Sequence, residues 1–338
     1  MKKKIPFNKP YNATNGIKFI ENSIKGGHIS GRGPFTLKSE KLLKKKIPGS
    51  KKILLTTSCT HALEISAILM NFKNGDEIIV PSYTYVTSAL AFYMHGAKLV
   101  FADIRSDTLN IDENKIESLI TKKTKCIVVV HYAGVGCEMT KIMQIAKKNN
   151  IIVIEDNAHS LFGKYKNKFL GTIGDLSTLS FHETKNLTCG EGGALLVNNN
   201  KFVKNAEIIL EKGTNRIKFS KGLINKYSWV GKGSSYVLSD ILASFLYSQL
   251  IESKLIQNKR KFIWNYYNKN LKHWSNKNNI LLPHIPIHCK QSYHMYYILL
   301  PNKKNRDLLI SFLSKKGIQA IFHYLPLNLS KVINKKNI

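Results

Sequence analysis

Hydrophobic and polar positions show two different periodicities along the first two thirds of the chain. Short apolar runs such as KKILLTT and IIVIED resemble buried strands, and the segments between them place apolar residues at helical spacing. The strands are expected over 51–57, 76–80, 97–103, 125–134 and 151–156. The helices are expected over 60–72, 85–96, 112–120 and 138–149. This alternation predicts an α/β fold with a mostly parallel sheet and helices on both faces.

The pattern changes after residue 177, where shorter strands precede a helical run from about 238 to 271. A smaller α+β segment closes the chain. Its expected elements are a strand over 291–300, a helix over 306–317 and a strand over 317–324. We therefore predict a large domain over 1–240, which includes the N-terminal arm, and a small C-terminal domain over 241–338.

The bulk composition is that of a folded protein that is not exported. Hydrophobic residues make up 43% of the 338 positions, and no apolar run is long enough to span a bilayer. The basic N-terminus MKKK has no apolar segment behind it. The five cysteines are scattered and form no CxxC pair. We expect a cytoplasmic protein without membrane insertion and without a metal site.

The net charge of +31 raises the question of nucleic-acid binding. Only five of the 52 Lys and Arg residues are arginine, the residue that binds phosphates and guanine edges with two bonds at once. The lysines are spread evenly and accompanied by abundant Asn and Ile, as an AT-rich coding bias would produce. We expect no nucleic-acid partner, although a basic surface can attract a small anionic substrate.

Two places along the predicted sheet carry polar residues that could bind a ligand. Ser58, Cys59 and Thr60 follow a strand and precede a helix, where free N–H groups and hydroxyls can bind an anion or simply cap the helix. Asp156 ends an apolar strand, at the sheet edge where such folds bind ligands. An aspartate at that position can also form a turn.

Lys185 lies in the polar stretch SFHETKNLTCGEGG, with Ser180 before it and glycines after it. A lysine held in a pocket out of water loses its proton more readily and can attack a carbonyl carbon. An anion site, a strand-end aspartate and a pocket lysine together are what pyridoxal 5'-phosphate requires. Tyr83 and Tyr85, after the strand over 76–80, offer an aromatic ring to cover one face of that cofactor.

With these residues the chain resembles the DegT/DnrJ type of sugar-nucleotide aminotransferases, which are pyridoxal-phosphate enzymes of fold type I. The resemblance covers nearly the whole chain and rests on GRGPFT, TTSCTHALE, PSYTYVTSA, HYAG, EDNAH, SFHETKN and GEGGAL. Within that family, FHETKN, EKGTNR and GSSY look most like the dTDP-4-amino-4,6-dideoxygalactose transaminases of enterobacterial common antigen synthesis.

The resemblance implies a role for each matching residue. Lys185 takes the position of the lysine that carries the cofactor aldehyde, and Asp156 that of the partner of the pyridine nitrogen. His159 falls near the position of the cofactor's phenolic oxygen, and Tyr85 occupies the ring-stacking position. The phosphate contacts are expected from Thr60, the backbone of His61 and Ser180, beside Ser58 and Cys59.

The sequence departs from the family pattern at two places. Many members complete the phosphate site with an asparagine from the neighbouring subunit, where this chain has Val237, so we expect Ser234 or Ser235 to substitute. After HYLPL the chain continues as NLSKVINKKNI, and the small domain is therefore expected to be shortened at its end.

The resemblance implies an aminotransferase that moves an amino group from L-glutamate to a nucleotide-linked 4-keto-6-deoxy sugar. The expected acceptor is dTDP-4-dehydro-6-deoxy-D-glucose, the expected product dTDP-4-amino-4,6-dideoxy-D-galactose, and the expected assembly a homodimer. One alternative is a pyridoxal-phosphate sugar dehydratase, although such members place histidine where this chain has Lys185. The other is a shortened, non-catalytic paralogue that binds a ligand or nucleic acid.

Overall fold

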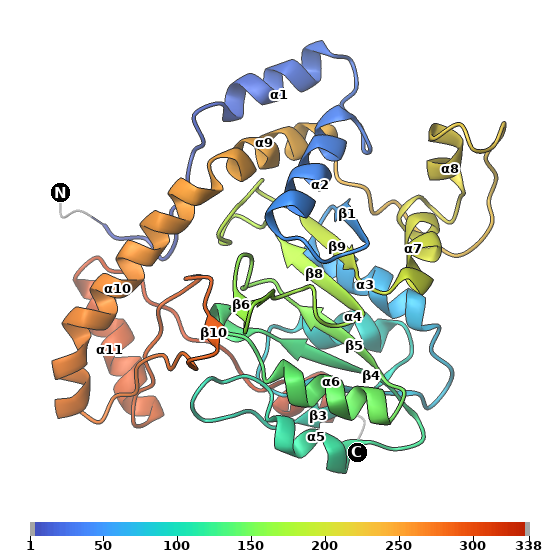
Figure 1. Ribbon diagram of the computed structural model, residues 1–338. Coiled ribbons are helices and arrows are strands. Elements are labelled where there is room, and N and C mark those ends of the chain that lie inside the picture. Colours follow the sequence, from blue (N-terminus) through green and yellow to red (C-terminus); the bar gives the residue numbers. More distant parts are fainter. Residues whose placement is uncertain (1–3, 335–338) are drawn as a thin grey trace.

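The computed structural model describes residues 4–334, and a seven-stranded sheet in the order β1-β9-β8-β5-β4-β2-β3 forms its centre (Figure 1). The strands are β1 (Lys52–Thr56), β2 (Glu77–Pro81), β3 (Lys98–Ala102), β4 (Thr124–Val130), β5 (Ile152–Asp156), β8 (Leu176–Ser180) and β9 (Gly193–Val197). Neighbouring strands are parallel except where β9 pairs with β1 and β8. The predicted mostly parallel sheet is confirmed.

Helices cover both faces of this sheet (Figure 1). One face packs against α3 (Cys59–Met70), α4 (Thr87–Met94) and α7 (Val203–Leu210), and the other against α5 (Glu113–Leu119) and α6 (Met139–Lys148). Strand β4 shows why its sequence is continuously apolar. Val128 packs with α3 and α4, whereas its neighbours Ile127 and Val129 pack with α5 and α6. Successive side chains of a strand point to opposite faces, so both faces need apolar residues.

A third core lies between the sheet and the helices α2 (Pro34–Lys46) and α9 (Asp240–Ile251). Helix α1 (Gly16–Lys25) lies against α9, and the expected single helical run divides after α9 into α10 (Ser253–Lys277). Helix α9 thus packs with the first part of the chain. The division into domains over 1–240 and 241–338 stays a prediction, and its residues 1–3 and 335–338 lie outside the described residues.

The two strands predicted near the C-terminus were wrong. Residues 291–300 and 317–324 make only isolated bridges, of Leu299 with Leu281 and of Ile318 with Ile5. The apolar side chains of the first segment serve a different purpose, because Met295, Tyr297 and Leu299 pack on a small cluster around Tyr132. The expected helix is present as α11 (Lys303–Lys315).

The remaining elements are short. A second sheet joins β10 (Cys289–Lys290), β6 (Lys164–Tyr165) and β7 (Lys168–Phe169). Two further helices are α8 (Arg216–Ser220) and α12 (Lys331–Asn334). The 3-10 helices span Tyr132–Gly134, Asn200–Phe202 and Leu327–Leu329. Among residues 4–334 we find no helix with the length and apolar character needed to cross a membrane.

The carboxyl ends of the parallel strands bring the predicted site residues to one edge of the sheet. Asp156 is the last residue of β5 and lies opposite Thr178 of β8, two residues before Ser180. Ser58 follows the end of β1, which lies beyond β9 in the same sheet. This edge is where open α/β sheets bind ligands.

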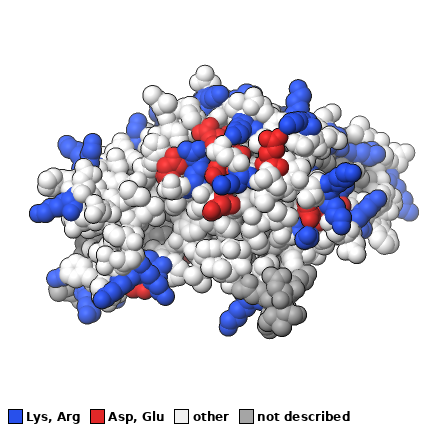
Figure 2. All heavy atoms as spheres, turned by 90° about the horizontal axis from the view of Figure 1, so that it is seen from below, with Lys and Arg blue, Asp and Glu red and all other residues white. Residues whose placement is uncertain are grey.

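Charged side chains are distributed rather than gathered on the face seen in Figure 2. Lysine and arginine side chains lie at many separate places there, and acidic side chains lie among some of them. On this face the excess positive charge therefore forms no single continuous stripe.

The motif GRGPFT is explained by a contact with α9. Pro34 begins α2, and Gly33 before it has no side chain to cap the helix. The buried Asp240 carboxylate instead accepts hydrogen bonds from the N–H groups of Phe35 (3.0 Å) and Thr36 (2.7 Å) and from the Thr36 hydroxyl (2.8 Å). A Cβ at Gly33 would lie 2.5 Å from the Asp240 Cγ, so this close approach requires glycine.

Replacing Asp240 with alanine is expected to lower the free energy of unfolding by about 1–3 kcal/mol, because it removes a helix cap and leaves buried donors without an acceptor. Urea titration measures the change. Asp307→Ala is the matched control, since that carboxylate is 52% exposed and pairs with the neighbouring Arg306. Equal effects of the two substitutions would contradict the capping role.

Candidate active site

The start of α3 holds four of the predicted residues. Ser58 has an extended backbone, and its Oγ accepts a hydrogen bond from the N–H of His61 at 3.1 Å. The His61 ring is bound in turn by the Thr57 hydroxyl. Ser58 therefore caps the helix, and Cys59 and Thr60 follow in the first turn. The other N–H groups of that turn have no partner within the helix and can still bind an anion.

The Asp156 carboxylate is held by two donors. Its Oδ2 accepts a hydrogen bond from the Ser88 hydroxyl at 2.7 Å, and its Oδ1 accepts one from the N–H of Ala158 at 3.1 Å. The Ser88 hydroxyl lies 2.9 Å from that of Thr84, so a buried chain of hydroxyls from the start of α4 supports the carboxylate. Asp156 therefore has a fixed orientation at the end of its strand.

Lys185 lies in the connection between β8 and β9. Its backbone is held on both sides, since its N–H donates to the carbonyl of His182 at 2.9 Å and its carbonyl accepts from Arg260 at 3.2 Å. Burial lowers the pKa of its amine, and electrostatic interactions with Cys59 and Asp156 offset part of this lowering. Lys185, Asp156 and Cys59 at the start of α3 are thus close enough to interact electrostatically, and they form one candidate site.

Cys59 lies within this site as an uncharged thiol. Its Sγ donates a hydrogen bond to the Thr178 hydroxyl at 3.4 Å. Burial raises the pKa of the thiol, and the negative charge of Asp156 raises it further. A thiol kept protonated in this way is a poor nucleophile, which leaves the Lys185 amine as the reactive group.

His159 lies beside the lysine and carries an unused nitrogen. The residue is buried, and burial lowers the pKa of its ring well below the ordinary value, with Lys185 and His323 adding to the effect. Its Nδ1 has no hydrogen-bond partner within residues 4–334. A buried polar atom without a partner is costly, so this nitrogen is suited to a polar group of a bound ligand.

Tyr85 and Ser180 lie at the borders of this site. Tyr85 is 57% exposed, and its ring centroid lies 6.1 Å from that of Tyr324, which in turn interacts electrostatically with Asp156. Ser180 ends β8, and its Oγ accepts a hydrogen bond from the N–H of His182 at 3.4 Å.

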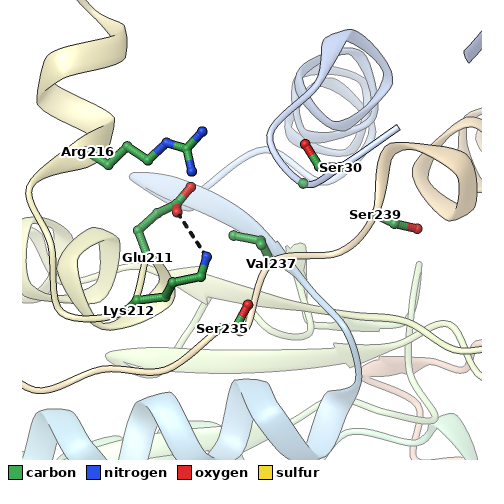
Figure 3. A pocket seen from close by; sticks show the side chains of 8 residues that line it. Ser30, Glu211, Lys212, Arg216, Ser235, Val237 and Ser239 are labelled. Atoms are coloured by element: carbon green, nitrogen blue, oxygen red, sulfur yellow. Dashed lines mark ion pairs between the residues drawn. The ribbon is translucent and has the colours of Figure 1, made fainter. Parts of the chain in front are cut away.

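Ser235 lines a cavity of about 260 Å³, and Ser234 precedes it in the chain. In Figure 3, Val237 lies between Ser235 and Ser239 on one segment, and Glu211, Lys212 and Arg216 come from the neighbouring one. Within the described part of the chain, neither Ser234 nor Ser235 is hydrogen-bonded to the residues around Lys185. In a single copy this segment borders the start of α3, where the N–H of Thr57 donates to the carbonyl of Tyr236 at 3.0 Å.

Comparison with known protein families identifies the family of this chain. Residues 11–337 match the DegT/DnrJ/EryC1/StrS aminotransferase family. The chain belongs to this family. It is 36% identical to an uncharacterized protein of Methanocaldococcus jannaschii, over 98% of this chain and 86% of that protein. It is 31% identical to the GDP-perosamine synthase of Caulobacter vibrioides, over 87% of this chain and 78% of that enzyme.

Solved structures of sugar aminotransferases have the same fold as this chain. A putative sugar aminotransferase of Streptococcus pneumoniae, solved in a PLP form and a PMP form, superposes with a TM-score of 0.90 at 28% identity. The match covers 99% of this chain and 88% of that one. DegT/DnrJ aminotransferases depend on pyridoxal phosphate, and this chain is accordingly a pyridoxal-phosphate-dependent sugar aminotransferase.

The residues of this family member fit that cofactor. The Lys185 amine has a lowered pKa, as an amine that must attack an aldehyde requires. The orphaned Nδ1 of His159 can meet a polar atom of a bound ring, and the open first turn of α3 can meet a phosphate. The site thus offers a nucleophile, a polar partner and an anion site.

Several residues of the site were not predicted from the sequence. Ser88 could have been suspected, since it is a hydroxyl within the apolar helix that follows Tyr85. His323 and Tyr324 stand in the motif FHYLPL, and their rings stack at 4.3 Å. Arg260 and His294 gave no signal, because each reaches Lys185 or its neighbours only through tertiary packing.

Replacing Lys185 with methionine is expected to raise the free energy of unfolding of the cofactor-free protein. The folded-state pKa lies below the ordinary value of 10.5, so the unfolded chain binds the proton more tightly. Wild-type stability is therefore lost as the pH falls from 10.5 toward the folded pKa, and methionine avoids this loss. The gain should be larger at pH 7 than near pH 10.5, as urea titrations can show. No gain relative to Lys168→Met, at an exposed position, would contradict the burial of the amine.

Proposed function

We propose that the protein transfers an amino group from L-glutamate to a nucleotide-linked 4-keto-6-deoxy sugar. The observation that carries the proposal is the interaction of the Lys185 amine with Asp156, which ends its strand at the carboxyl edge of the sheet. A buried amine beside a fixed carboxylate is what a transamination site needs.

Each residue of the site has its own role in the proposed reaction. Bound pyridoxal phosphate supplies an acceptor for the negative charge that develops on the substrate carbon. The Nζ of Lys185 would hold the cofactor at rest and, once free, would take a proton from the substrate carbon and return it. Asp156 would face the ring nitrogen, the start of α3 would bind the phosphate and His159 would contact the ring oxygen.

We propose dTDP-4-dehydro-6-deoxy-D-glucose as the acceptor and dTDP-4-amino-4,6-dideoxy-D-galactose as the product. The motifs FHETKN, EKGTNR and GSSY support this choice within the family. The similarity to a GDP-perosamine synthase supports a nucleotide-linked sugar, with GDP as the competing nucleotide. The net charge of +31 favours the approach of any diphosphate-bearing substrate.

A direct test begins with the purified protein and added pyridoxal phosphate. An absorbance band of the lysine-bound cofactor should form, and glutamate should bleach it. A panel of dTDP- and GDP-linked keto sugars should then restore the band, and the dTDP-linked 4-keto-6-deoxy sugar should do so fastest. A band that glutamate never bleaches would instead favour the non-catalytic paralogue.

We also propose that the protein works as a homodimer. The segment around α8 exposes several large apolar side chains, among them Leu223 at 67% and Trp229 at 83%, and such patches mark contact surfaces. The segment precedes Ser234 and Ser235, the two serines expected to substitute for the cross-subunit asparagine. Light scattering should give twice the chain mass of 38.3 kDa.

A further inference from the structure

The segment after β10 brings His294 against two residues of the active site. The His294 ring is stacked on that of His159, with centroids 4.3 Å apart and an interplanar angle of 19°. Its Nδ1 lies 2.9 Å from the Oδ1 of Asn186, the residue after Lys185. His294 thus contacts the side chain of one predicted cofactor residue and the neighbour of another.

The hydrogen-bonding pattern fixes the proton on His294. The Asn186 amide nitrogen donates to the carbonyl of Ser292 at 2.7 Å and to the Gln257 side chain at 3.0 Å. Both amide hydrogens are therefore used, and the Asn186 Oδ1 can only accept. His294 must then donate from its Nδ1, which leaves its Nε2 without a proton in the neutral ring.

Both stacked rings are uncharged at neutral pH. Burial lowers the pKa of His159 and of His294 well below the ordinary value, and the nearby Lys185 and His323 act in the same direction on both. Two neutral imidazoles can stack at this distance without charge repulsion. The stack covers one face of His159 and restricts its rotation, while its Nδ1 remains without a partner.

The backbone of the same segment is tied to the site as well. The Arg260 guanidinium on α10 donates to the carbonyls of His294 at 2.9 Å and of Lys185 at 3.2 Å. The Ser292 hydroxyl donates to the carbonyl of His159. Arg260 and Ser292 therefore fix the backbone at Lys185, His159 and His294 relative to one another. Neither residue was predicted from the sequence.

We propose that His294 is a positioning residue, which orients His159 through its ring and the Lys185 segment through its bond to Asn186. The inference rests on the proposed transamination and adds a residue to its machinery. Its physical basis is preorganisation, because a displacement of about 1 Å in a catalytic group can cost about a hundredfold in rate.

Two substitutions separate the two contacts. His294→Phe keeps a ring against His159 but leaves the Asn186 Oδ1 without its donor, whereas His294→Asn keeps a donor and removes the stack. His284→Phe is the matched control, since that histidine is exposed. The holoenzymes are compared by the wavelength of the bound-cofactor band and by kcat/KM for glutamate.

Each His294 variant should shift the band and lower kcat/KM about tenfold or more, and the control should do neither. Wild-type band and kcat/KM in both variants would overturn the inference, even if their thermal midpoints fall, because the role would then be structural only. If the wild type itself forms no band that glutamate bleaches, the proposed function fails and this inference falls with it. If the wild type forms a band that glutamate bleaches and both His294 variants match it in band and kcat/KM, the proposed function stands and only this inference is wrong.

Discussion

Lys185→Ala is expected to lower the rate of transamination by about a thousandfold or more and to abolish the band of the lysine-bound cofactor. The substitution removes the amine that holds the aldehyde and the base that moves the proton, and general acid–base catalysis alone contributes about 10²–10⁴-fold. Absorbance spectra with added pyridoxal phosphate and glutamate turnover measure the two effects.

The matched control is Lys168→Ala, which removes an exposed lysine and should change neither the spectrum nor the turnover. The predicted effect is specific to one amine among many, because its environment lowers the pKa of Lys185. A band that persists in Lys185→Ala and vanishes in a variant of another lysine would refute the assignment of the linkage.

Asp156→Asn is expected to reduce kcat by about 10²–10³-fold while the protein still folds. An amide has nearly the same shape. Its oxygen can still accept from the N–H of Ala158 and its NH2 can donate to the Ser88 hydroxyl oxygen, so the site should keep its geometry. What it loses is the negative charge that favours a protonated ring nitrogen, and preorganised electrostatic contacts of this kind are worth about that factor. Steady-state turnover with glutamate and a keto sugar measures kcat.

Asp103→Asn provides the comparison, since that residue is exposed and its carboxylate accepts a hydrogen bond from the N–H of the neighbouring Ile104. Its turnover should equal that of the wild type. If Asp156→Asn retained wild-type kcat, the carboxylate would act only as the turn-forming residue that its sequence position also allows.

These two substitutions also address the competing functions. A sugar dehydratase of this family would place histidine at the position of Lys185, whereas this chain places a lysine with a lowered pKa there, beside Asp156. A non-catalytic paralogue would not require an amine with a lowered pKa at Lys185. It would also not require the hydrogen bond by which the Ser88 hydroxyl holds the Asp156 carboxylate. Substitutions of Lys185 and Asp156 therefore distinguish the competing functions most directly.

Local sequence patterns were sufficient to predict the sheet and to place Asp156 and the start of α3 at its carboxyl edge. The strand ending at Asp156 and the helix beginning at Cys59 could be read from apolar periodicity, because buried parallel strands need apolar residues on both faces. Since parallel strands end at the same edge, their polar end residues had to meet there. Lys185 was a candidate because of its polar, glycine-flanked stretch, and the family resemblance gave it the position of the cofactor lysine.

Tertiary packing decided everything that depends on contacts between distant segments. The strand-like run QSYHMYYILL forms no regular strand, because its side chains pack on Tyr132 and its His294 stacks on His159. The pairing of Asp240 with the start of α2 joins residues more than 200 positions apart. Periodicity reports only which face of an element is buried, so the partner that covers that face is known only once the chain has folded.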